Sequence, residues 1–169
     1  MNKIFKYIIL FAGLLLLQIL LFNNIQFSGY VNPYVYVMFI IMLPLGMPEW
    51  MVLLLCFLTG FTVDLFCGTM GVHTAASVMA GFFRPFLLSL NITSEATSTS
   101  STPSVKNNGL RWFIIFTLSI VLVHHLTLFY VEVFRFSGFF RTLLRALTST
   151  LFTTFFIVII ELFRSRRRM

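Results

Sequence analysis

The sequence predicts an all-α integral membrane protein with about six transmembrane helices. Of its 169 residues, 59% are hydrophobic and only 10% are charged, whereas a soluble domain is roughly half apolar and about a quarter charged. The apolar residues gather in runs, several of them long enough to cross a hydrocarbon layer about 30 Å thick. The low charge content excludes a soluble enzyme, a coiled coil and a disordered chain. We therefore expect residues 1–169 to form a single transmembrane domain.

The first two predicted helices differ in strength. Two lysines, Lys3 and Lys6, precede an uncharged run over residues 8–22 that is not followed by the small-residue cleavage pattern of a signal peptide, so we expect an uncleaved first helix over residues 4–22. A second helix is expected over residues 32–45, because Asn32 suits a cap and Pro33 suits a first turn. This segment is short for a span, so it requires tilt, a thinner bilayer or an earlier start.

Four longer helices complete the predicted bundle. A glycine turn at residues 68–71 separates the third helix from the fourth. Residues 91–109 are rich in serine and threonine and are predicted to form a flexible loop outside the bilayer, whereas residues 164–169 form a basic tail. The predicted helices cover residues 49–67, 71 or 72 to 90, 110–133 and 140–163. Almost the whole chain is then used for spans, so we expect its function to reside in the membrane.

The basic residues predict the orientation of the chain. The net charge of +7 comes from Lys and Arg at the edges of apolar runs, which indicates orientation signals rather than nucleic-acid binding. With both termini cytoplasmic, nine Lys and Arg lie on that side and three on the other. In the tail, attraction to anionic lipid or to an acidic partner is a second expected role. The tail arginines are Arg164, Arg166, Arg167 and Arg168.

A stripe of small residues surrounds the one acid in the third helix. Cys56, Gly60, Asp64 and Gly68 recur every four residues and so share one helix face. Small residues on such a face let another helix approach closely. The fourth helix offers a matching surface, and we expect the two helices to pack as a tight hairpin. That surface comprises His73, Ala76, Ser77, Ala80, Gly81 and Arg84.

Charge inside a bilayer needs a partner, so we expect Asp64 to be paired. Arg141 and Arg145 lie near the same outer side of the membrane, and His73 is a possible hydrogen-bond donor to the carboxylate. We interpret Asp64 as a buried anchor that fixes helix register, with a ligand or proton site as the alternative. Glu132 and Arg135 form a predicted surface pair of small energetic weight. The candidate charge partners are therefore Arg84, Glu132, Arg141 and Arg145.

The adjacent histidines His124 and His125 favour a packed role over a metal site. Neighbouring side chains on a helix point about 100° apart, so both rings cannot easily serve one ion. The chain has no H-E-x-x-H, C-x-x-C, nucleotide-binding or nucleophile-elbow motif. We expect no metal, no cofactor and no enzymatic activity. Cys56 and Cys67 would lie about 16 Å apart along one helix, too far to form a disulfide.

Residues 60–75 resemble the conserved segment of the bacterial rod shape-determining membrane protein family MreD. The matching positions are Gly60, Asp64, Gly68 and Gly71, here called the glycine–aspartate motif, followed by small residues. Length, six spans and a basic tail also fit this family. The family in turn resembles the substrate-binding subunits of energy-coupling-factor vitamin transporters, which implies a similar fold.

The resemblance implies a non-enzymatic scaffold of the peptidoglycan elongation complex that maintains rod shape. The expected location is the bacterial inner membrane, and the motif with His73 is expected to shape a hairpin that a partner helix meets. Implied partners are an MreC-like periplasmic scaffold, an MreB-like filament, a peptidoglycan polymerase and transpeptidase, and membrane lipid, but no nucleic acid. The alternative is a small-molecule-binding subunit of an energy-coupling-factor-type transporter.

Overall fold

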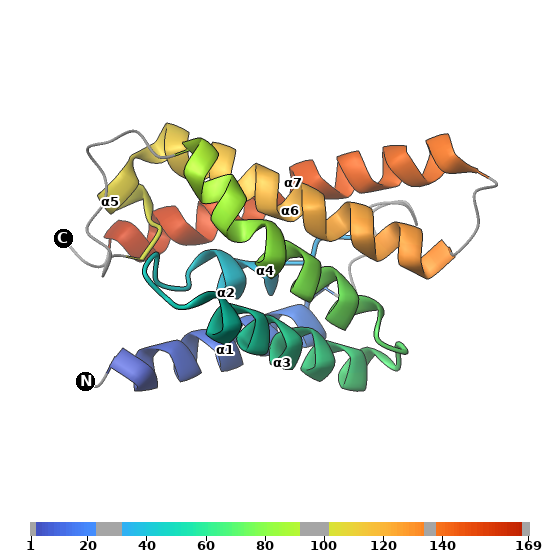
Figure 1. The fold of residues 1–169 in the computed structure, drawn as a ribbon, viewed down its shortest axis with the longest axis horizontal. Helices are drawn as coiled ribbons and strands as arrows, with labels where there is room; N and C mark the ends of the chain where they lie inside the picture. Colours follow the sequence, from blue (N-terminus) through green and yellow to red (C-terminus); the bar gives the residue numbers. More distant parts are fainter. Residues whose placement is uncertain (1–2, 23–31, 92–101, 134–137, 167–169) are drawn as a thin grey trace.

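The computed structural model describes residues 3–22, 32–91, 102–133 and 138–166, and these residues form helices and connecting segments without a strand (Figure 1). This confirms the predicted all-α class. The helices are α1 (Lys3–Leu20), α2 (Val37–Ile41), α3 (Glu49–Cys67), α4 (Val72–Asn91), α5 (Val105–Asn108), α6 (Leu110–Val133) and α7 (Phe139–Arg166).

Within the part of the chain that the structure describes, three helices are long and apolar enough to cross a membrane. They are α3, α6 and α7, while α1 holds a shorter apolar stretch at Phe5–Leu20. Helix α6 is 24 residues long, which exceeds the roughly 20 residues that a span requires. The long apolar helices support the predicted membrane protein. By length and composition, the described residues show three such helices.

The helices α1, α3, α6 and α7 run roughly along the long axis of the molecule, and α4 crosses between α3 and α6 at an oblique angle (Figure 1). The first residues of α1, α3 and α6 lie at the same end as the last residues of α4 and α7. Packing is closest between α3 and α4, between α4 and α6, and between α6 and α7. We call the end that holds the start of α1 the terminal end, and the other the turn end.

The predicted second transmembrane helix is wrong. In its place the chain forms α2, only five residues long, and every residue of α2 is buried. Residues 32–36 before it are not helical. Residues 35–43 are buried and belong to the hydrophobic core that the long helices surround. This part of the chain therefore lies inside the bundle and is not a lipid-exposed helix.

Side chains from α1 and α7 form hydrogen bonds with the backbone of residues 33–35, so these residues do not need a helix to satisfy their backbone groups. The Gln18 side chain accepts a hydrogen bond from the Val35 N–H (2.8 Å) and donates one to the Pro33 carbonyl (3.3 Å). From α7, Thr153 Oγ1 accepts from the Tyr34 N–H (3.0 Å). Non-helical backbone is tolerated at membrane depth only where its polar groups are satisfied within the protein. These contacts satisfy that condition.

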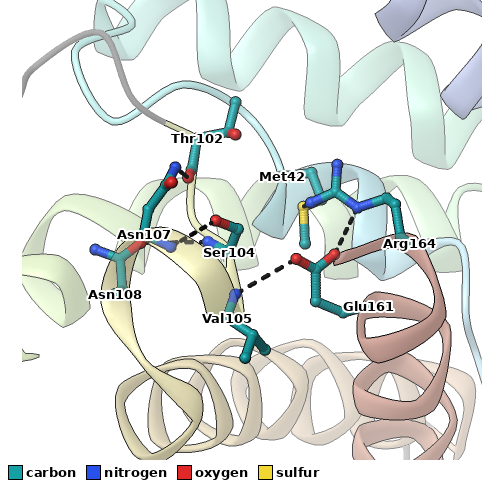
Figure 2. A network of polar contacts seen from close by, with 8 residues as sticks. All are labelled: Met42, Thr102, Ser104, Val105, Asn107, Asn108, Glu161 and Arg164. Carbon is teal, nitrogen blue, oxygen red and sulfur yellow. Dashed lines mark hydrogen bonds and ion pairs between the residues drawn. The ribbon is translucent and has the colours of Figure 1, made fainter. Parts of the chain in front are cut away.

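A polar network ties α5 to α7 at the terminal end (Figure 2). Glu161, buried in α7, pairs with Arg164 and accepts a hydrogen bond from the Val105 N–H at 3.4 Å. The Arg164 guanidinium also contacts the Met42 sulfur at 3.0 Å. Arg164 is therefore engaged within the protein. Arg167 and Arg168 lie outside the described residues, as does the side chain of Arg166.

The predicted flexible loop is described only in part, because residues 92–101 lie outside the described range. Its last part is more ordered than the serine- and threonine-rich composition suggests. Ser104 caps α5 by accepting a hydrogen bond from the Asn107 N–H at 3.1 Å. Asn107 also donates to the Thr102 carbonyl at 3.0 Å. This helix folds back against the Glu161 network (Figure 2).

Candidate functional site

Asp64 lies in the last turns of α3 and is only 4% exposed. One carboxylate oxygen accepts hydrogen bonds from the Thr69 hydroxyl and from the His73 N–H at 3.0 Å. The other accepts from the Thr74 N–H at 2.8 Å and from the Thr74 hydroxyl at 2.6 Å. Both oxygens are thus held by the turn after α3 and by the first turn of α4.

This geometry makes Asp64 a helix cap supplied by the preceding helix. The first N–H groups of a helix have no partner within it, and the helix dipole favours a negative charge there. Two of the first N–H groups of α4, those of His73 and Thr74, donate to the carboxylate. Gly68 and Gly71 adopt φ values of 66° and 81°, a region that favours glycine, and so form the tight turn that brings α4 back.

Two glycines set the distance between α3 and α4. A Cβ atom on Gly60 would lie 2.5 Å from the His73 carbonyl oxygen and from the Thr74 Cα. A Cβ atom on Gly81 would lie 2.6 Å from the Cys56 sulfur. Because both separations are shorter than van der Waals contact, a side chain at either position would collide; at Gly60 the neighbours are backbone atoms of α4, so this approach requires glycine there, whereas at Gly81 the neighbour is the end of a side chain. Gly60 therefore places the α4 backbone where Asp64 reaches it.

Of the two kinds of partner expected for Asp64, the hydrogen bond from His73 is confirmed, although it comes from the backbone rather than the ring. Among the described residues, the polar contacts of the carboxylate are to Thr69, His73 and Thr74, and no ion pair with an arginine forms. Arg145 instead pairs with Glu132 at 3.2 Å and lies over the Phe129 ring. Arg135, the predicted partner of Glu132, lies outside the described residues. Arg141 is exposed near the start of α7.

Arg84 is a second buried charge in the hairpin, nearer the terminal end. Its side chain is 2% exposed and donates to the Leu43 carbonyl and, at 3.4 Å, to the Pro44 carbonyl. Its Nε atom has no hydrogen-bond partner among the described residues. Arg84 therefore holds the chain just after α2 through backbone oxygens rather than through a carboxylate.

The three histidines of the chain meet two tyrosines in one cluster, here called the Tyr–His cluster. Its members are Tyr34, Tyr36, His73, His124 and His125. The Tyr36 hydroxyl lies 3.0 Å from His73 Nδ1 and 2.6 Å from His124 Nε2. A phenol carries one proton, so it donates to one ring and accepts from the other. The Tyr34 ring contacts His73, His124 and His125, with centroids 5.1, 6.2 and 5.5 Å away.

His125 has a tautomer fixed by its partners. Its Nδ1 lies 2.8 Å from the Val121 carbonyl, which can only accept, so Nδ1 carries the proton. Nε2 then accepts from the Thr153 hydroxyl at 3.2 Å, and the Thr153 oxygen accepts from the Tyr34 N–H. His124 differs, since its Nδ1 has no partner among the described residues.

The side chains of this cluster contact one another directly. Among the described residues, no group of three His, Cys, Asp or Glu side chains is placed to hold a metal. Sequence reasoning singled out each histidine but missed Tyr34, Tyr36 and Thr153, which bring the rings together. It also missed Thr69 and Thr74. Both threonines follow Asp64 within ten residues, in the predicted turn and the start of the next helix. This placement could have indicated them, because hydroxyl groups near a buried acid can donate hydrogen bonds to it.

Comparisons with known proteins identify no relative: no family model, no curated protein and no solved structure matches this chain.

Proposed function

We propose that this protein is a non-enzymatic membrane scaffold of the MreD type, which binds other membrane proteins of the peptidoglycan elongation complex through its helices. The observation that carries the proposal is the use of the glycine–aspartate motif. Gly60 and Asp64 hold the α3–α4 hairpin together. Gly60 allows α4 to approach closely, and both carboxylate oxygens of Asp64 accept hydrogen bonds from within the hairpin. A motif used in this way shapes a surface rather than a ligand site.

The remaining parts of this proposal concern topology. A six-pass arrangement places α1, α3, α4, α6 and α7 across the bacterial inner membrane, with residues 32–48 returning through the bundle interior. The starts of α1, α3 and α6 lie at one end of the molecule, which supports this path (Figure 1). Both termini are then cytoplasmic, as the count of Lys and Arg predicts.

The Tyr–His cluster bears on the alternative, a small-molecule-binding subunit of an energy-coupling-factor-type transporter. Such a subunit needs a pocket of several hundred Å³ with convergent polar groups. The convergent polar groups are Tyr36, His73 and His124, but the Tyr36 hydroxyl occupies the space between the two rings and bonds both. Direct packing of this kind favours the scaffold.

Co-purification tests the proposal. The full chain is isolated from native membranes in mild detergent, and the bound proteins are identified by mass spectrometry. An MreC-like protein should be recovered with the wild-type chain, and depletion of the chain should round the cells. Asp64→Asn, which keeps the shape but removes one acceptor oxygen, should reduce both partner recovery and rod shape. Recovery of no elongation protein with the wild-type chain, together with normal cell shape on depletion, would refute the scaffold.

A further inference from the structure

An aromatic groove lies on the outer face of the α3–α4 hairpin near the terminal end. Its volume is about 420 Å³. Gly81 and Pro85 offer no long side chain there, while three phenylalanines of α4 and one leucine of α3 stand around them. The lining residues are Glu49, Leu53, Gly81, Phe82, Phe83, Pro85 and Phe86. The groove is therefore apolar with one acid, at the first residue of α3.

Glu49 is the feature that distinguishes this groove from an ordinary lipid-facing surface. The other described carboxylates are engaged: Asp64 caps α4, Glu132 pairs with Arg145, and Glu161 pairs with Arg164. Glu49 is exposed and makes no hydrogen bond or ion pair with any described residue. A negative charge at a helix start is favoured by the helix dipole, but that does not explain why it lines a groove of phenylalanines.

We propose that this groove binds a transmembrane helix of another protein, which carries a Lys or Arg at the level of Glu49. The inference rests on the proposed scaffold function and assigns its docking surface. Membrane helices commonly carry Lys or Arg at the cytoplasmic end, and the groove has its acid at the end proposed to be cytoplasmic. Phosphate headgroups at that level are repelled by the carboxylate, so charge complementarity favours a basic helix over an anionic lipid.

A second copy of this chain fits the groove less well. The groove belongs to α3 and α4, so a copy inserting a different helix, such as α1 with Lys6, would make a head-to-tail contact. Such contacts close into rings only at particular angles and otherwise form open chains. A partner that contributes one basic helix makes a complex of defined size.

The test places a photo-reactive phenylalanine analogue at position 82 of the full chain in native membranes. The same analogue at Phe155 is the control, since Phe155 is also exposed and lies on α7, which is long and apolar enough to span a membrane. Illumination should link position 82 to a membrane protein whose spanning helix begins with Lys or Arg. Glu49→Lys should lower the cross-linked fraction at least about tenfold, because like charges then face each other. Reversing the partner's basic residue to Glu should restore it.

A matched variant separates charge reversal from general damage. Trp50→Lys adds a cation at the same level from an exposed neighbour that does not line the groove, and it should leave the cross-link unchanged. Phe86→Ala, at an exposed groove position, should weaken the cross-link, whereas Phe155→Ala should not. Both comparisons are made on variants that insert at wild-type level.

Several outcomes would overturn the inference. They are a cross-link only to lipid, a cross-link to a second copy, a partner cross-link that survives Glu49→Lys, and no cross-link at position 82. In each case co-purification of elongation proteins with the unmodified chain decides separately on the proposed scaffold function, because that measurement does not depend on the groove.

Discussion

Asp64 and Arg84 are buried charges of opposite sign in the same hairpin, and neither forms an ion pair with a described residue. The carboxylate accepts from two backbone N–H groups and two hydroxyls, so all its hydrogen bonds lie within the hairpin. The guanidinium donates to two carbonyls outside the hairpin and leaves Nε without a partner among the described residues. Both oxygens of Asp64 are therefore hydrogen-bonded, whereas the guanidinium of Arg84 is hydrogen-bonded only in part.

The difference indicates what each charge does for the fold. Burial of a charge is costly unless hydrogen bonds replace its hydration. Asp64 meets that condition and should stabilise the hairpin, since it also satisfies the start of α4. Arg84 does not meet it, so its net contribution to stability should be small. Its contacts to the Leu43 and Pro44 carbonyls instead suggest that it fixes where the buried segment after α2 lies.

The largest effect is expected for Asp64→Ala. Two backbone N–H groups at the start of α4 lose their acceptor, and each buried unsatisfied donor costs about 1–3 kcal/mol. We expect unfolding in mixed micelles, followed by circular dichroism, to show a loss of about 4 kcal/mol. Glu132→Ala, which removes a partly exposed ion pair, should cost less than about 1 kcal/mol. Equal losses in the two variants would contradict the capping role.

A somewhat smaller loss is expected for Gly60→Ala. Its new methyl group would meet the α4 backbone at 2.5 Å, and overpacking of this kind costs about 3 kcal/mol. Gly13→Ala is the control, because a Cβ atom there has no neighbour within 4 Å. That change should stabilise α1 by up to about 1 kcal/mol. If the two glycine variants unfold alike, the close approach of α3 and α4 is not as described.

Tyr36→Phe extends the comparison to a neutral buried group. Removal of the hydroxyl leaves His73 Nδ1 and His124 Nε2 without their shared partner, and a loss of about 1–2 kcal/mol is expected from the unsatisfied rings. Thermal unfolding in detergent measures the change. A gain in stability would contradict this expectation, because it would mean that the hydrogen bonds of the Tyr36 hydroxyl do not offset the cost of burying it.

The smallest effect on stability is expected for Arg84→Met. The Leu43 carbonyl loses its donor, which costs about 1–3 kcal/mol, but an apolar side chain of similar length also relieves the burial of an incompletely hydrogen-bonded charge. Because these effects oppose each other, the same unfolding assay should give a change within about 1 kcal/mol of zero. A loss of stability as large as that of Asp64→Ala would contradict the claim that Asp64 contributes more to stability than Arg84.

The sequence was sufficient for the long helices and insufficient for the interior. The bounds of α3 and α6 agree with the predicted ranges, because apolar runs there end at glycine or polar residues. The segment at 32–45 was mistaken for a span because Gln18 and Thr153, which satisfy its backbone, lie far away in the chain. No local pattern reveals such partners.

The candidate site was predicted in position but not in chemistry. The recurrence of small residues located the hairpin, and the close approach at Gly60 follows from that pattern. The expected partners of Asp64 were an arginine or His73; His73 does donate, but through its backbone N–H, and the neighbouring Thr74 N–H, which was not expected, donates beside it. The Tyr–His cluster depends on three segments meeting, which the order of residues along the chain does not reveal.

Amide hydrogen exchange at the start of α4 tests the central claim most directly. The claim is that Asp64 serves the hairpin as its cap, rather than serving a ligand. In the wild-type protein in lipid nanodiscs, the His73 and Thr74 amides should exchange slowly. In Asp64→Asn they should exchange at least about tenfold faster, with α6 unchanged, because local opening there becomes easier. Unchanged exchange at His73 and Thr74 in the variant would contradict the account.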